Sequence, residues 1–188
     1  MQMIDLLLTN GDLFTMAGDG VGYLEKGAVA IDGNRIVAVG PSTDLQAKYQ
    51  ARRTIDATMK AILPGLIDGH LHTVIAILRG LGQDAPTWHE GVDAFFEQLT
   101  PAAVLAGAQL SAIEAIRAGT TTLGDYGPGM PIALPFYEKL GVRAIVCTLI
   151  SEVPPVESTL AEGELYPFDP AIGESRLQEN LDLIGQWN

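Results

Sequence analysis

The stretch LPGLIDGHLH at residues 63–72 decides the fold class of this chain. From residue 61 to residue 69 the sequence is apolar except for one charged residue, Asp68. A strand without alternation of polar and apolar residues is typical of a parallel sheet that is covered on both faces. We therefore predict a buried parallel strand here, and His70 and His72 come directly after it.

Downstream of this strand, helix and strand patterns alternate. Thr100 suits a helix N-cap, Pro101 suits the first helical position, and Gly119 suits the residue that ends a helix. The order β-α-β-α-β-α predicts parallel strands that are joined by right-handed crossovers. The later predicted elements are a strand at 120–123, a helix at 135–140, a strand at 142–150 and a helix at 175–187.

Upstream, short apolar runs separated by tight-turn signals fill the first sixty residues. The turn signals are Asn10-Gly11 and Asp32-Gly33-Asn34, because Gly and Asn tolerate the positive φ that tight turns require. Short strands of this kind predict a small β-sandwich over residues 1–60, followed by an α/β part over residues 61–188. The predicted strands are 4–8, 13–16, 28–31, 35–39 and 53–56, with a short helix at 44–52.

Composition excludes several classes of protein. The 188 residues are 47% hydrophobic and carry a formal net charge of −12, with scattered basic residues, so we expect neither disorder nor nucleic-acid binding. No apolar run reaches the roughly 18 residues of a membrane span, and the first ten residues lead us to expect no secretory signal. Cys147 is the only cysteine, so we expect no internal disulfide, a buried thiol and a cytoplasmic location.

His70 and His72 are the clearest candidates for a chemical role. Residues i and i+2 of an extended strand point to the same face, so both imidazoles would reach one ion. Histidine nitrogen is a common zinc ligand, and the C-terminal ends of strands hold the active sites of β/α barrels. The pair alone also fits two hydrogen-bonded surface histidines, so its interpretation depends on the surrounding sequence.

That surrounding sequence resembles a known family. The stretch at 63–72 closely resembles the first-strand signature of the amidohydrolase superfamily, where it connects a small β-sandwich to strand 1 of a metal-dependent barrel. The upstream segment 31–40 resembles the sandwich of that family, and Met59 stands where members commonly have Gly. The segments LRGL at 78–81 and 114–125 resemble the chlorohydrolase and nucleoside-deaminase branch.

The resemblance implies a metal-dependent hydrolase in which His70 and His72 bind a divalent ion, with Zn²⁺ as the first candidate and Fe²⁺ as the second. The ion lowers the pKa of a water molecule, which attacks a ring carbon. The implied reaction is hydrolytic deamination, or dechlorination, of a purine-, pterin- or triazine-like ring. The implied fold is α/β: a partial (β/α)8 TIM-like barrel, about the first three βα units, preceded by the small β-sandwich.

The same resemblance places the loop after the first strand beside the substrate. Trp88, His89 and Glu97 are therefore candidate contacts to a small heterocyclic substrate; packing or plain solvent exposure is the alternative for each. The family's remaining histidine and aspartate ligands and its proton-moving glutamate have no counterpart here. No catalytic residue is thus assigned within the chain, which we expect to be inactive alone. Family relatives are often homodimers, so the resemblance also implies a homodimer as one expected state of the full-length enzyme.

Two other functions stay open at this point. A cyclic-amide hydrolase of the hydantoinase, dihydroorotase or dipeptidase type shares the first-strand signature, although the segment 78–81 favours the deaminase branch. A non-catalytic truncated fragment would account for the missing ligands. A serine hydrolase is not supported, because the sequence contains no Gly-x-Ser-x-Gly turn.

Overall fold

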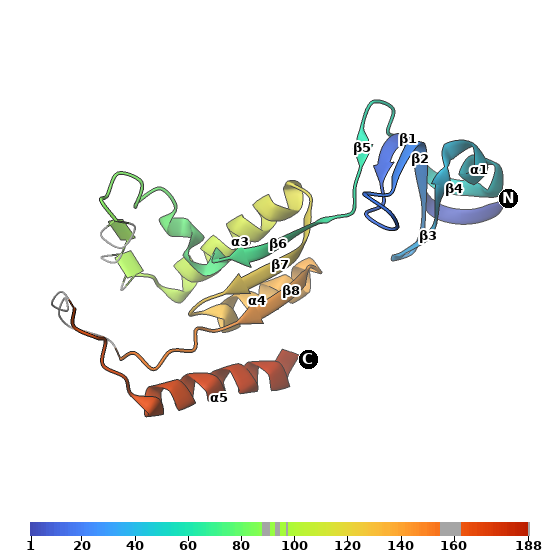
Figure 1. Ribbon diagram of the computed structural model, residues 1–188. Coiled ribbons are helices and arrows are strands. Elements are labelled where there is room, and N and C mark those ends of the chain that lie inside the picture. Colours follow the sequence, from blue (N-terminus) through green and yellow to red (C-terminus); the bar gives the residue numbers. More distant parts are fainter. Residues whose placement is uncertain (88–90, 93–94, 97, 155–162, 188) are drawn as a thin grey trace. The chain divides into compact units, whose positions relative to one another are not determined.

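The computed structural model describes residues 1–87, 91–92, 95–96, 98–154 and 163–187 (Figure 1). Its contacts divide the chain into two compact units, Met1–Pro64 and Gly65–Asn188, which we call unit 1 and unit 2. None of the helices in the described part of the chain is long and apolar enough to cross a membrane.

Unit 1 is a five-stranded sheet in which the strand order is β3-β2-β1-β4 and β5 pairs with β1. Strand β1 runs antiparallel to β2 and parallel to β4. Helix α1 (Ser42–Lys48) buries Leu45 against Ile4 and Tyr49, which form the core of this unit. The strands are β1 (Gln2–Phe14), β2 (Tyr23–Asp32), β3 (Arg35–Pro41), β4 (Tyr49–Asp56) and β5 (Ala61–Ile62).

One predicted turn in unit 1 is wrong and another is confirmed. Strand β1 continues through Asn10-Gly11, where the register to β2 shifts on both sides of Gly11. Asn10 has a φ of 60°, so an irregularity inside the strand accommodates the positive φ that we assigned to a turn. The hairpin between β2 and β3 is as predicted, and Gly33 has a φ of 57° there.

Met59 offers a direct test of backbone strain in unit 1. It has a φ of 62° and is 95% exposed, in a turn closed by a 2.9 Å hydrogen bond from Lys60 N–H to the Ala57 carbonyl. The left-handed conformation costs a residue with a Cβ about 1–2 kcal/mol. Glycine removes this cost, but it also raises the conformational entropy of the unfolded chain, which offsets part of the gain. We expect Met59→Gly to raise the free energy of unfolding by about 0.5–1 kcal/mol, measured by denaturant titration.

The control for this prediction is Met59→Ala, which shortens the exposed side chain and keeps the Cβ. We expect no comparable gain from it. An equal gain from both variants would show that the methionine side chain, and not the backbone conformation, is the source of the strain.

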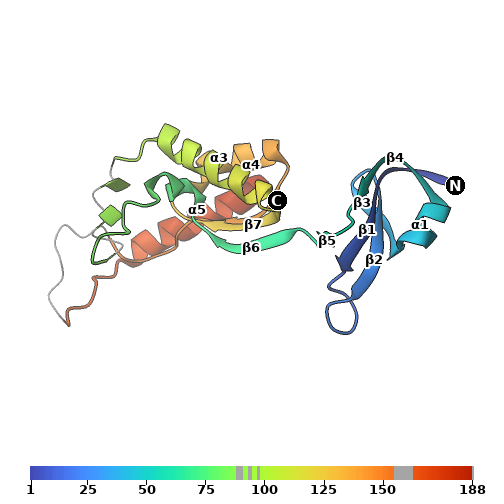
Figure 2. The ribbon, with the colours of Figure 1, turned by 90° about the horizontal axis from the view of Figure 1, so that it is seen from above.

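The described part of unit 2 contains three parallel strands in the order β6-β7-β8, which confirms the predicted parallel arrangement. Helices α3 and α4 lie side by side on one face of this sheet (Figures 1 and 2). The elements are β6 (Leu66–Leu71), the 3-10 helix η1 (Thr73–Leu78), α3 (Pro101–Arg117), β7 (Thr120–Tyr126), α4 (Met130–Leu140), β8 (Arg143–Cys147) and α5 (Pro170–Trp187).

The core of unit 2 lies between the sheet and the helices. Leu123 of β7 and Met130 of α4 are fully buried there, as are Ala108 and Ala112 of α3. The limits of α3 are those expected: the Thr100 hydroxyl accepts a 3.2 Å hydrogen bond from the Ala103 N–H, as an N-cap does. The helix-forming signals in this segment were therefore sufficient to locate it.

Other boundaries and burial predictions in unit 2 are wrong. Helix α4 begins at Met130, five residues before the predicted start at Pro135, and β8 ends at Cys147. Cys147 is exposed because it lies two residues after Ile145, on the face of the sheet that the described helices leave uncovered. Strand β6 is not covered on both faces either, since Ile67 is 75% exposed.

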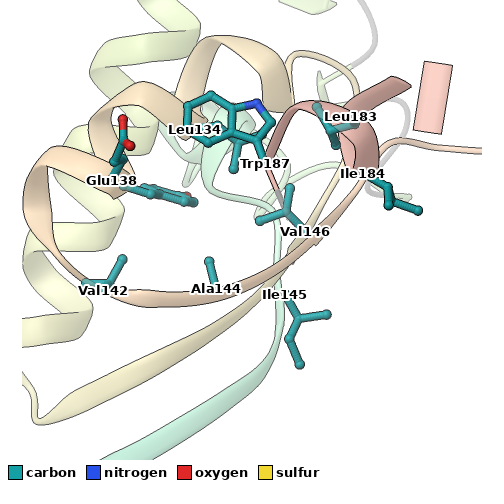
Figure 3. Close-up of a pocket in the computed structure, with 10 residues that line it drawn as sticks. Leu134, Glu138, Val142, Ala144, Ile145, Val146, Leu183, Ile184 and Trp187 are labelled. Carbon is teal, nitrogen blue, oxygen red and sulfur yellow. The ribbon is translucent and has the colours of Figure 1, made fainter. Parts of the chain in front are cut away.

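Figure 3 shows how β8 faces the helices. A hollow of about 350 Å³ lies between α4, β8 and α5, and it is lined by apolar side chains with Glu138 at its rim. Ala144 and Val146 point toward the helices, whereas Ile145 points to the other face and is 77% exposed. An apolar side chain therefore stands on the face of the sheet that the described helices leave uncovered.

Candidate functional site

The ends of β6 and β7 bring three aromatic rings together. His70 lies near the C-terminal end of β6, and His72 follows that strand directly. Their ring centroids are 5.0 Å apart, and the ring of Tyr126, the last residue of β7, lies 5.3 Å from His70 and 4.2 Å from His72. The two histidines therefore share the edge of the sheet at which parallel strands end, as the sequence pattern suggested.

A hydrogen bond to the backbone fixes the tautomer of the neutral His72 ring. Its Nδ1 atom lies 3.0 Å from the backbone carbonyl oxygen of Tyr126. Because a carbonyl oxygen only accepts, we assign the proton to Nδ1, which leaves the lone pair on Nε2. A backbone carbonyl that holds one imidazole nitrogen in this way orients the other nitrogen as a metal ligand.

The donor set fits part of a metal site. His70 and His72 offer two imidazoles at one edge, and Asp68 accepts a 3.3 Å hydrogen bond from the backbone N–H of His70. Within the described ranges, no three His, Cys, Asp or Glu side chains gather closely enough to hold an ion. Since catalytic zinc sites use three protein ligands, this pair would need a further ligand from elsewhere.

Beneath the histidines lies a buried hydrogen-bonded cluster of Thr73, Asp125 and Tyr137. Each of the three residues is at most 2% exposed. Asp125 accepts hydrogen bonds from the Thr73 N–H at 3.1 Å, from the Thr73 hydroxyl at 2.5 Å and from the Tyr137 hydroxyl at 2.6 Å. Burial, together with the hydrogen bond to Asp125, raises the pKa of Tyr137, so its hydroxyl remains a donor.

The sequence pointed to only one member of this cluster. Asp125 ends the segment 114–125 that carries the family resemblance, and it accepts the hydrogen bond from the Thr73 N–H. Tyr137 belongs to α4 and carries no local signal for such a contact, because it reads as one more apolar position on a helix. Only the packing of α4 against β7 brings its hydroxyl to Asp125.

An apolar hollow of about 140 Å³ adjoins His72 and Tyr126. A hollow with an apolar lining suits a flat, weakly polar part of a ligand more than a charged group. The remaining lining residues are Val74, Ile75, Phe96, Gly127, Pro128 and Leu149.

A bidentate ion pair joins the two downstream segments that carry the family resemblance. Arg79 Nη1 lies 2.7 Å from Glu114 Oε2, and Arg79 Nη2 lies 3.3 Å from Glu114 Oε1. The hydrogen bond and positive charge of Arg79 lower the pKa of Glu114. Both side chains are about half exposed, so solvent screens the pair and it contributes little to stability.

The structure does not test the predicted substrate contacts, unlike the two histidines. Trp88, His89 and Glu97 lie outside the described residues, so their roles stay predictions.

Comparison with known proteins decides the family. A model described as the amidohydrolase family matches residues 61–180. The chain belongs to the amidohydrolase family. This confirms the resemblance that residues 63–72 suggested. In unit 1, a model described as an imidazolonepropionase-like composite domain of bacteria matches residues 27–49.

Curated relatives of this amidohydrolase chain are named as deaminases. It is 36% identical over 164 residues to a 5-methylthioadenosine/S-adenosylhomocysteine deaminase of Syntrophobacter fumaroxidans, a match that covers 83% of this chain and 37% of the relative. It is 28% identical over 189 residues to a 5'-deoxyadenosine deaminase of Methanococcoides burtonii, covering 99% and 39%. The chain thus spans about two fifths of the length of these relatives.

Solved structures show the same fold. An adenosine deaminase from Xanthomonas campestris with bound zinc matches with a TM-score of 0.71 and 25% identity, covering 100% of this chain and 40% of that one. Atrazine chlorohydrolase from Arthrobacter aurescens, in complex with zinc, matches with a TM-score of 0.74 and 24% identity, covering 97% and 43%. The amidohydrolase chain therefore has an α/β fold with parallel strands like those of these structures.

Proposed function

We propose that this chain is the N-terminal part of a metal-dependent hydrolase that deaminates a purine-like ring, with adenosine-type nucleosides as the first substrate candidates. The observation that carries this proposal is the pair His70 and His72 at the C-terminal edge of the sheet, with His72 Nε2 free to act as a ligand. The names of the deaminase relatives support the choice of reaction.

The proposal includes a fold for the complete enzyme. Unit 2 would supply about the first three βα units of a (β/α)8 TIM-like barrel, and residues 1–60 would form part of the preceding β-sandwich. The exposed Ile145 supports this arrangement, because it stands on the face away from the helices, which a closed barrel buries as its interior. The three-stranded sheet alone would leave that face in water.

His70 and His72 would hold the metal in this enzyme. Zinc is the first candidate ion because two similar structures contain it, and Fe²⁺ is the second. When bound, the ion supplies a Lewis acid that lowers the pKa of a water molecule. The chain's own residues contribute the fixed His72 ring and the apolar hollow beside Tyr126, which would receive the flat substrate ring.

A substrate panel tests the reaction class in the complete enzyme. We expect ammonia release from 5'-deoxyadenosine, 5'-methylthioadenosine or S-adenosylhomocysteine. Ring opening of a hydantoin or a dihydroorotate without ammonia release would replace the deaminase proposal with the cyclic-amide alternative. Chloride release from a chlorotriazine as the sole activity would assign the dechlorinase reaction instead. If no substrate of any class were turned over, the non-catalytic alternative would stand.

A further inference from the structure

Asp125 is a buried carboxylate that the proposed chemistry does not use. It is 2% exposed, and neither ion pair found in the described part of the chain involves it. It lies two residues after Leu123, which is in the core between sheet and helices, and its carboxylate meets the hydroxyl of Tyr137 from α4. Asp125 thus belongs to the layer between β7 and α4, on the side of the sheet away from a bound substrate.

The end of β7 nevertheless reaches His72 in two ways. The backbone carbonyl of Tyr126 binds the His72 ring, and the carboxylate of the preceding residue, Asp125, binds the residue that follows His72. One contact holds the ring and the other holds the adjacent backbone. The orientation of His72 therefore depends on β7 as well as on its own strand.

The Asp125 carboxylate also takes the place of a helix cap. The Thr73 N–H is the first backbone donor of η1, and His72, at the N-cap position, makes no side-chain cap hydrogen bond. Asp125 Oδ1 accepts from that N–H at 3.1 Å, while Oδ2 accepts from the Thr73 hydroxyl and the Tyr137 hydroxyl. A carboxylate with three donors pins the turn between β6 and η1 firmly, because any movement leaves a buried charge with fewer hydrogen bonds.

We propose that Asp125, Thr73 and Tyr137 form a positioning cluster that holds the His72 imidazole with Nε2 toward the metal. The inference rests on the proposed function, since it requires His72 to be a ligand. Loss of the cluster frees the turn at Thr73 and lets the His72 ring leave the Tyr126 carbonyl. Substituting partners that orient a metal ligand typically weakens metal binding by about 10- to 100-fold.

A matched pair of variants at Thr73 separates positioning from packing. Thr73→Val keeps the volume and shape of the side chain but removes the hydroxyl donor, whereas Thr73→Ser keeps the donor. We expect Thr73→Val to bind Zn²⁺ about 10- to 100-fold more weakly in competition with a chromophoric chelator. Thr73→Ser should retain most of the zinc affinity of the unsubstituted enzyme.

Two further variants extend the test to the other members. Asp125→Asn removes the charge at nearly constant size, and we expect the same range of weakening. Tyr137→Phe removes one donor and should have a smaller effect of the same sign. The visible spectrum of the Co²⁺-substituted enzyme should change in Asp125→Asn and Thr73→Val, because it reports ligand geometry. If Asp125→Asn fails to fold, the Thr73 pair still decides the question.

The outcomes distinguish this inference from the function on which it rests. Lower unfolding midpoints with unchanged zinc affinity and an unchanged Co²⁺ spectrum would assign the cluster a purely structural role and overturn the positioning proposal alone. If the unsubstituted enzyme bound neither Zn²⁺ nor Co²⁺, the proposed function itself would fail, and the positioning proposal with it.

Discussion

Replacing His70 and His72 together with alanine is expected to abolish metal retention by the complete enzyme. Each substitution removes one imidazole from the edge where the two rings lie 5.0 Å apart. A catalytic zinc with three protein ligands would keep at most one of them. We expect elemental analysis of the purified double variant to find no zinc or iron above background, with loss of turnover.

His89→Ala is the control, because it removes the remaining histidine of the chain and leaves the proposed pair intact. We expect this variant to retain its metal. Circular dichroism of all variants verifies that metal loss does not arise from unfolding. Full metal content in the folded double variant would contradict the assignment of His70 and His72.

Gly124→Ala is expected to destabilise unit 2 and to weaken metal binding at the same time. A Cβ at this position of β7 would lie 2.9 Å from the carbonyl oxygen of Gly69 and 3.0 Å from its carbonyl carbon. These are backbone atoms of β6, which move only if the pairing between β6 and β7 is disturbed. We expect a loss of about 1–3 kcal/mol in the free energy of unfolding, measured by denaturant titration.

The effect on metal binding follows from the position of Gly69, which directly precedes His70. Displacement of β6 moves the His70 and His72 rings relative to Tyr126 at the end of β7, which disturbs the hydrogen bond that orients His72. The zinc affinity of Gly124→Ala should therefore fall together with its stability.

Gly69→Ala is the matched control on the facing strand. A Cβ on Gly69 meets no atom within 4 Å, and its φ is not in the left-handed region. We expect this variant to unfold within about 0.5 kcal/mol of the unsubstituted protein, as unstrained exposed sites do. A loss equal to that of Gly124→Ala would show that the close approach of the two strands is not the cause.

Local signals in the sequence predicted the elements that depend on local physics. Thr100 and Gly119 flank α3 because capping groups act within one helical turn, and the hairpin at Gly33 needs only a residue that tolerates positive φ. The parallel order of β6, β7 and β8 followed from the alternation of strands and helices.

Predictions failed where tertiary contacts decide. Asn10-Gly11 carries a strong turn signal, yet β1 runs through it while pairing with both β2 and β4. Pro135 suggests a helix start, although α4 begins five residues earlier, at Met130, which is buried in the core of unit 2. In both cases, pairing and packing outweigh a local preference.

The sequence by itself determined that His70 and His72 share a strand end, because their spacing of two residues places both rings on one face. Only the tertiary structure decided which nitrogen of His72 is free and which residues hold it. Tyr126, Asp125 and Tyr137 lie more than fifty residues from His72 and Thr73 in the chain. Their hydrogen bonds depend on the register of β6 against β7 and on the packing of α4, and neither is encoded in any local pattern.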